Sequence, residues 1–258
     1  MAAVKFGTKQ MLATALGALL FTTATLPATA QTPAPAQRMN GNQFPPGVGM
    51  PAPSTPEEIE AAKPNPQAPG FRIPLPPLDQ MDPAMRAAFI SASQGFHTPI
   101  GNRVPLMLTP EVSTAMNYML PALGKANIPQ DIWELTILMV GREWTAQFEW
   151  WTHVTQAVMV GLPADAVEAI RVGKRPKFAN PGQEATYQYM VELLQDHNVK
   201  DATYEKLRLI LGSRALVELT TLAGYYSTVA MNLVAPNIPL RSDVKDPLPR
   251  LAKPFPGH

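Results

Sequence analysis

The positions of the prolines constrain the fold of this chain more than any other feature. Of its 29 prolines, 13 fall between residues 31 and 80. Such a segment cannot keep the hydrogen bonds of a helix, so residues 31–81 are expected to form a polyproline-like linker, or an arm that docks on a neighbouring surface. The folded domain is expected at residues 82–240, followed by a C-terminal tail at residues 241–258.

Residues 1–30 have the pattern of an export signal. Lys5 and Lys9 precede an apolar run, and the small residues Ala28 and Ala30 match a cleavage site. We expect cleavage after Ala30 and an exported protein, periplasmic or secreted. The alternative is an uncleaved membrane anchor, but threonines and a proline interrupt the apolar run early.

The composition excludes several classes of protein. The chain has no cysteine, so disulfides, thiol chemistry, cysteine-ligated zinc and iron–sulfur clusters are all excluded. Its 21 basic and 20 acidic residues leave a formal net charge of +1, which does not suggest binding to nucleic acid through a basic face. Stability must therefore come from the burial of apolar side chains.

After the proline-rich segment, the sequence carries repeated start signals for helices. Asp82, Thr109 and Asn180 each stand directly before a proline, the pattern of an N-cap followed by proline at the first helical position. Gly161, followed closely by Pro163, is expected to end the helix before it. Because no stretch alternates like a strand, these signals predict a compact all-α domain of six to eight helices.

One segment, "REWTAQFEWWTH" at residues 142–153, concentrates the residues that can carry chemistry. Glu149 and His153 lie four positions apart in it. On a helix they share one face, and a carboxylate beside an imidazole holds the ring in one tautomer, as in general acid–base catalysts. The alternative is an exposed ion pair on a solvated face, and the spacing alone leaves both possibilities open.

Glu134 is a further catalytic candidate, because it stands alone in an apolar run. A lone acid in such a run either points to solvent or faces a group that needs it. Trp144, Trp150 and Trp151 are expected to supply apolar walls around the same segment.

Four residues are candidates for substrate binding: Arg142, Trp150, Tyr225 and Asn232. Arg142 is expected either to pair with a substrate carboxylate through its bidentate fork or to form an ion pair between helices. Tyr225 and Asn232 lie in the apolar string "TLAGYYSTVAMNLV", where a buried phenol or amide must find a partner. Tyr226, in the same string, is expected in the core.

A metal site is the chemical alternative to acid–base catalysis here. Two carboxylates and one histidine are enough ligands for iron or manganese, but no second histidine follows at helical spacing, so no metal and no cofactor are expected. The remaining histidines, His97, His197 and His258, are expected at the surface.

Two motifs resemble a known family. The string "ELTILMVGREWTAQFEWWTHVTQAVMVGLPADAVEAI" and the later "ALVELTTLAGYYSTVAMNLV" are similar to the carboxymuconolactone decarboxylase family, and the likeness runs from about residue 99 to residue 240. The resemblance implies a small all-helical protein that assembles into homotrimers or homohexamers.

The same superfamily contains the peroxidases associated with alkyl hydroperoxide reductase. There a glutamate, a Cys-x-x-Cys pair and a histidine form a thiol relay, which the resemblance places at Glu134, Ala146, Glu149 and His153. Both sulfurs are missing from this chain, so thiol peroxidase chemistry is excluded. What remains resembles the decarboxylase branch.

These observations predict an exported, cofactor-free lyase that acts on a small lactone or an unsaturated carboxylate. His153 is the expected proton donor, oriented by Glu149 or Glu134. Decarboxylation of the family's named lactone is a cytoplasmic step, so the physiological substrate of an exported protein is expected to differ. The alternative is a non-catalytic helical oligomer or small-molecule binder, because a fold does not imply a function.

Overall fold

The computed structural model describes residues 72, 73, 76, 78–87, 101–240, 244, 245 and 247–255. The predicted export signal, most of the proline-rich segment, His97 and His258 lie outside these residues. No helix within the described ranges is long and apolar enough to cross a membrane.

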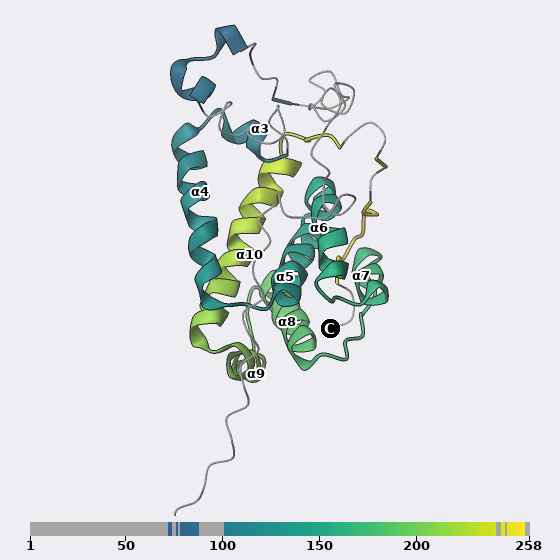
Figure 1. Ribbon diagram of the computed structural model, residues 1–258. Coiled ribbons are helices and arrows are strands. Elements are labelled where there is room, and N and C mark those ends of the chain that lie inside the picture. The colour runs from purple at the N-terminus through teal and green to yellow at the C-terminus, as the bar shows by residue number, and fades with distance from the viewer. Residues whose placement is uncertain are drawn as a thin grey trace, which may run out of the picture. The chain divides into compact units, whose positions relative to one another are not determined.

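The described residues form helices joined by short turns, without any strand, which confirms the all-α prediction (Figure 1). The α-helices are α3 (Arg103–Leu106), α4 (Pro110–Leu123), α5 (Gln130–Glu143), α6 (Gln147–Met159), α7 (Ala164–Arg171), α8 (Pro181–Val191), α9 (Asp201–Leu211) and α10 (Ser213–Val234). Shorter 3₁₀ and π turns cover Leu78–Gln80, Gly124–Ala126 and Glu192–Asp196.

The helix α5 is the centre of the packing. It contacts α6, α8 and α10, and every residue from Ile132 to Arg142 is buried (Figure 1). The string "TILMV" places apolar side chains on all sides of this helix. Such a helix is stable only inside a core. The single acid within this run, Glu134, is therefore carried into the interior of the domain.

The predicted helix starts occur at the expected positions. The Asn180 side chain accepts a hydrogen bond from the Gly182 amide at 2.8 Å, and the Asp82 side chain accepts one from the Met85 amide at 2.8 Å. Both bonds satisfy amides that a helix leaves without an internal partner. Thr109 is the N-cap of α4, but its side chain makes no capping hydrogen bond.

Two positive φ angles delimit the helix α6. Before it, Thr145 has φ 50°, an uncommon conformation for a β-branched residue, and this residue turns the chain from α5 into α6. After it, Gly161 has φ 110°, and α6 ends at Met159 as predicted from Gly161 and Pro163. The segment that carries Glu149 and His153 is thus one short helix held at both ends.

The helices α4 and α10 lie side by side, and α10 also packs against α5 and α6 (Figure 1). Only Met116 and Leu123 of α4 are buried, so much of this helix is left without a covering layer. The inner faces of α4, α6 and α10 enclose the pocket described below.

Segments at both ends of the helical domain are tied to it by hydrogen bonds. The Gln147 side chain donates to the Leu248 carbonyl and accepts from the Leu248 amide, both at 2.8 Å. Leu248 is buried, so this part of the predicted C-terminal tail packs on α6. Near the other end, Arg72 donates to the carbonyls of Ala235 and Pro236 beyond α10.

Candidate active site

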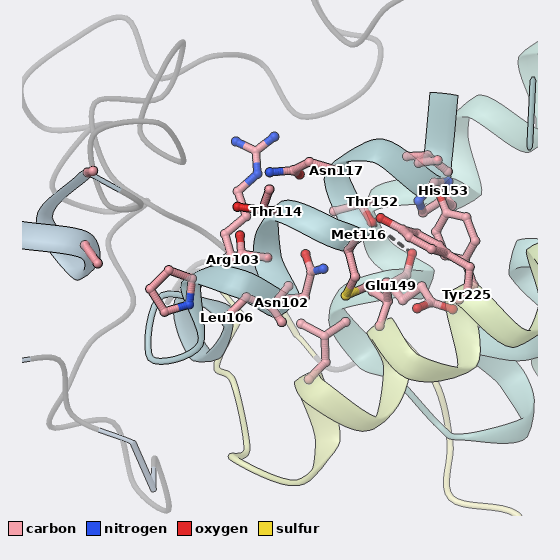
Figure 2. Close-up of a pocket in the computed structure, with 18 residues that line it drawn as sticks. Asn102, Arg103, Leu106, Thr114, Met116, Asn117, Glu149, Thr152, His153 and Tyr225 are labelled. Carbon is pink, nitrogen blue, oxygen red and sulfur yellow. Dashed lines mark hydrogen bonds between the residues drawn. The ribbon is translucent and has the colours of Figure 1, made fainter. Parts of the chain in front are cut away.

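A cavity of about 760 Å³ opens between α3, α4, α6 and α10. In Figure 2, His153, Glu149 and Tyr225 lie together on one side of this pocket, while Arg103 and Asn117 lie toward another. Its volume falls within the range of small-molecule sites, about 300–1,000 Å³. The residues that line it include apolar side chains and a few polar groups from separate helices.

His153 on α6 is paired with Glu134 on α5. The imidazole Nδ1 lies 2.8 Å from Oε2 of Glu134. The ring also packs edge to face on Tyr226, at 5.4 Å between centroids and 89° between planes. His153 lines the cavity and Glu134 does not, so the carboxylate contacts the ring without itself forming part of the cavity wall. With Nδ1 engaged in this way, Nε2 is the nitrogen that remains for a ligand.

Glu149 lines the same cavity but does not serve as the partner of His153. Its side chain is 2% exposed, and neither carboxyl oxygen has a hydrogen-bond partner among the residues that the structure describes. Burial raises the pKa of this carboxyl well above its ordinary value of 4.5. Burial therefore favours the neutral form of the Glu149 carboxyl, which is not part of a solvated helix face.

The position of Glu149 follows from a close approach of α5 and α6. A Cβ added at Gly141 on α5 would lie 3.4 Å from Oε1 of Glu149 and 3.7 Å from its Cγ. These are ordinary contact distances, so the first turn of α6 lies against α5 with Glu149 enclosed between them. A helix N-terminus favours negative charge, but the loss of water around Glu149 opposes ionisation and dominates here.

Arg142 does not contact the cavity, contrary to its predicted role in substrate binding. It is fully buried, and its Nη1 donates to the Arg171 carbonyl at 3.0 Å while Nη2 donates to the Thr145 hydroxyl at 2.8 Å. The expected ion pair between helices is not formed by these bonds either. Arg142 instead joins the end of α7 to the turn that leads into α6.

The other residues predicted to bind substrate are divided between core and pocket. Trp150 is 1% exposed and belongs to the hydrophobic core, and it does not line the cavity. Tyr225 lines the cavity and packs on Tyr226, which is both a core residue and a wall of the pocket. Asn232 is half-buried and lies outside the lining, and His197 is exposed as expected.

Several polar residues of the pocket were not predicted: Asn102, Arg103, Ser113, Thr114 and Asn117. They belong to α3, α4 and the turn before them. Burial raises the pKa of Tyr225, and the charge of Arg103 partly offsets this effect, so a cation faces the same space. No local pattern connects these residues with α6, because their proximity arises only in the folded chain.

Gly101 explains how this turn reaches α6. Its φ is 59°, and an added Cβ would lie 2.5 Å from Cε1 of Phe148, a contact that real Cβ atoms essentially never make. Phe148 directly precedes Glu149 on α6. The glycine therefore lets the segment that carries Arg103 pack against the helix that carries the acid–base residues.

No protein-family model and no curated protein matches this chain. The resemblance to the carboxymuconolactone decarboxylase family therefore stays a prediction. Within the described part of the chain, no three His, Asp or Glu side chains are grouped so that they could hold a metal ion.

Proposed function

We propose that this chain is a cofactor-free lyase in which His153 transfers a proton to a small lactone or unsaturated carboxylate. The observation that carries the proposal is the pairing of His153 Nδ1 with Glu134 at 2.8 Å, on the wall of a cavity that His153 lines. A histidine positioned by a carboxylate and facing a ligand space is a typical general acid or base.

In this mechanism, Glu134 is a positioning residue. Its carboxylate accepts the hydrogen bond from Nδ1–H, which orients the ring and stabilises the imidazolium form when Nε2 is protonated. Its 6% exposure keeps water from competing for this bond. Nε2 is then the atom that exchanges a proton with the substrate.

The proposed reaction is a decarboxylation. The bond between the substrate carbon and its carboxylate breaks, carbon dioxide leaves, and the electron pair is delocalised onto a conjugated carbonyl oxygen as a dienolate. His153 then donates the Nε2 proton to carbon and is reprotonated from water. One proton is consumed for each carbon dioxide released, and no redox cofactor is needed.

Arg103 is the proposed contact for a carboxylate that stays on the substrate. It lines the cavity, and its charge acts on the Tyr225 phenol across the pocket. A guanidinium binds carboxylates through two parallel hydrogen bonds. Arg103 takes the role predicted for Arg142, because it lines the cavity and Arg142 does not. The likeness of two sequence motifs to the decarboxylase family supports the choice of a lyase, and assembly into homotrimers or homohexamers is proposed on the same likeness.

The proposal is tested by incubating the purified protein with a panel of lactones and unsaturated carboxylates. We expect release of carbon dioxide and a protonated product from at least one member, at a rate that is proportional to protein concentration. Ligand binding without turnover across the whole panel would favour the alternative, a small-molecule binder.

A further inference from the structure

The proton transfer proposed above does not use Glu149, although this side chain lines the same cavity. It is 2% exposed, and both of its carboxyl oxygens lack a hydrogen-bond partner within the described part of the chain. A buried polar group is ordinarily satisfied, so an exception at a cavity wall is a candidate contact for a ligand. The unsatisfied carboxyl therefore marks a candidate contact point for something that enters the pocket.

The chemistry of that contact depends on the protonation state of Glu149. A carboxylate only accepts hydrogen bonds, whereas a carboxylic acid also donates one O–H. Burial raises the pKa of Glu149 well above its ordinary value, which favours the acid. The strongest hydrogen bonds of such an O–H donor are made to an oxygen that carries or develops negative charge.

The neighbouring hydroxyl on α6 is already engaged. Thr152 lines the cavity, but its Oγ1 lies 3.1 Å from the Phe148 carbonyl and 3.0 Å from the Glu149 carbonyl, to which it donates. On this helix, Glu149 and His153 also line the cavity, and the Glu149 carboxyl and Nε2 of His153 make no hydrogen bond among the described residues. Burial favours the acid form of the Glu149 carboxyl and Glu134 orients the His153 ring, so the two groups can act on different atoms of one ligand.

We propose that Glu149 donates its O–H to the oxygen of a planar, conjugated oxyanion, so that the pocket binds enolates and phenolates in preference to their neutral forms. This inference rests on the proposed lyase function, in which a dienolate oxygen forms next to the proton donor. Glu149 thereby contacts the oxygen, and His153 delivers the proton to carbon.

The protonation state is tested without any ligand, by infrared difference spectroscopy at neutral pH. We expect the carbonyl stretch of a protonated carboxylic acid in the wild-type protein and its loss in Glu149→Gln. Glu168→Gln is the matched control, because Arg171 lowers the pKa of Glu168 and keeps it ionised, so this change should leave the band in place. A wild-type spectrum without a band that depends on Glu149 would overturn the proposal.

The contact itself is tested with 4-nitrophenol, whose neutral and ionised forms differ in colour. We expect the bound probe to be the phenolate at a pH where the free probe is partly neutral. Glu149→Gln keeps an N–H donor and should bind within a few-fold of wild type, whereas Glu149→Met should weaken binding by about tenfold or more. Circular dichroism establishes that both variants are folded.

Three results would contradict the proposed contact. They are selective binding of the neutral phenol, absence of binding to folded wild-type protein, and unchanged affinity in folded Glu149→Met. Tyr225→Phe tests the neighbouring phenol as the donor, and loss of binding there but not in the Glu149 variants would also overturn the assignment.

The two proposals can fail separately. Binding of the phenolate through Glu149, with no turnover of any lactone or unsaturated acid, would refute the lyase and leave the oxyanion contact in place. Turnover that depends on His153, without the infrared band of Glu149, would refute the oxyanion contact alone.

Discussion

Oε2 of Glu134 on α5 lies 2.8 Å from Nδ1 of His153 on α6, although 19 residues separate the two along the chain. The pair depends on the turn at Thr145, which returns the chain so that α6 packs along α5. Because the carboxylate is buried behind the ring and the ring lines a cavity, one helix pair supplies both the proton-transfer group and the residue that orients it.

The role of Glu134 as a positioning residue predicts the behaviour of Glu134→Gln. An amide oxygen can still accept the hydrogen bond from Nδ1–H, but it lacks the charge that stabilises the imidazolium. We expect kcat to fall by about tenfold to a hundredfold while KM changes little. Steady-state kinetics on a substrate found in the panel measure this, and a rise in KM at unchanged kcat would show that Glu134 acts in binding instead.

The raised pKa of Glu149 predicts a pH dependence of stability. At low pH the carboxyl is protonated in both states, whereas above its ordinary pKa of 4.5 only the unfolded chain ionises it. The unfolded state then binds fewer protons, so wild-type stability falls as pH rises, until the folded pKa is reached. Relative to Glu149→Gln, the free energy of unfolding should fall by at most about 1.4 kcal/mol per pH unit.

Urea denaturation at a series of pH values measures that difference. Glu168→Gln is the control of opposite sign, because its lowered pKa makes the ionised carboxylate stabilising as pH rises. A gap between wild type and Glu149→Gln that stays constant with pH would show that Glu149 is ionised in the folded protein.

Replacing Arg142 is expected to lower the free energy of unfolding by a large amount. Arg142→Met removes the donors that satisfy the Arg171 carbonyl and the Thr145 hydroxyl, and it leaves the turn at φ 50° without its side-chain support. We expect a loss of about 2–4 kcal/mol in the free energy of unfolding. Arg208→Met is the control, because it removes only an exposed ion pair with Glu205 and should change little. Equal effects of the two variants would contradict a structural role for Arg142.

Gly101 is predicted to be required at its position. Gly101→Ala places a Cβ 2.5 Å from the Phe148 ring in a conformation with φ 59°, so either this ring or the turn that carries Arg103 must shift. We expect a loss of about 2 kcal/mol or more in stability, from overpacking and backbone strain together. Gly224→Ala is the control, since a Cβ meets nothing within 4 Å there, and it should stabilise α10 slightly. Equal and small effects at both glycines would show that the packing of Gly101 on Phe148 is loose.

The helices could be predicted from the sequence because their signals are local. Asn180 before a proline and Gly161 after a helix act on their own neighbours along the chain, and both behave as expected. Glu134 and His153 were also selected as candidates, although His153 was paired with either Glu149 or Glu134 and only the latter contact forms.

The remainder of the site could not be predicted, because it depends on packing between distant segments. The spacing of Glu149 and His153 indicates a shared face, but it does not reveal that the Glu149 carboxyl is enclosed against α5 near Gly141. The sequence around Arg142 does not distinguish an arginine that binds a substrate from one that donates to a carbonyl at the end of α7, as Arg142 does. Arg103 lines the pocket because α3 packs near α6 and α10 in the folded chain, and hydrophobic periodicity does not predict such a contact between distant segments.

The most direct test of the proposed function is the turnover of folded His153→Gln on a substrate that the wild-type protein decarboxylates. Glutamine keeps polarity and approximate size but cannot deliver a proton, so kcat should fall by about a hundredfold to ten-thousandfold, while circular dichroism and the denaturation midpoint stay close to wild type. His197→Gln, a change at an exposed histidine, should retain full activity. Near-wild-type turnover by a well-folded His153→Gln protein would contradict the assignment of His153 as the proton-transfer group.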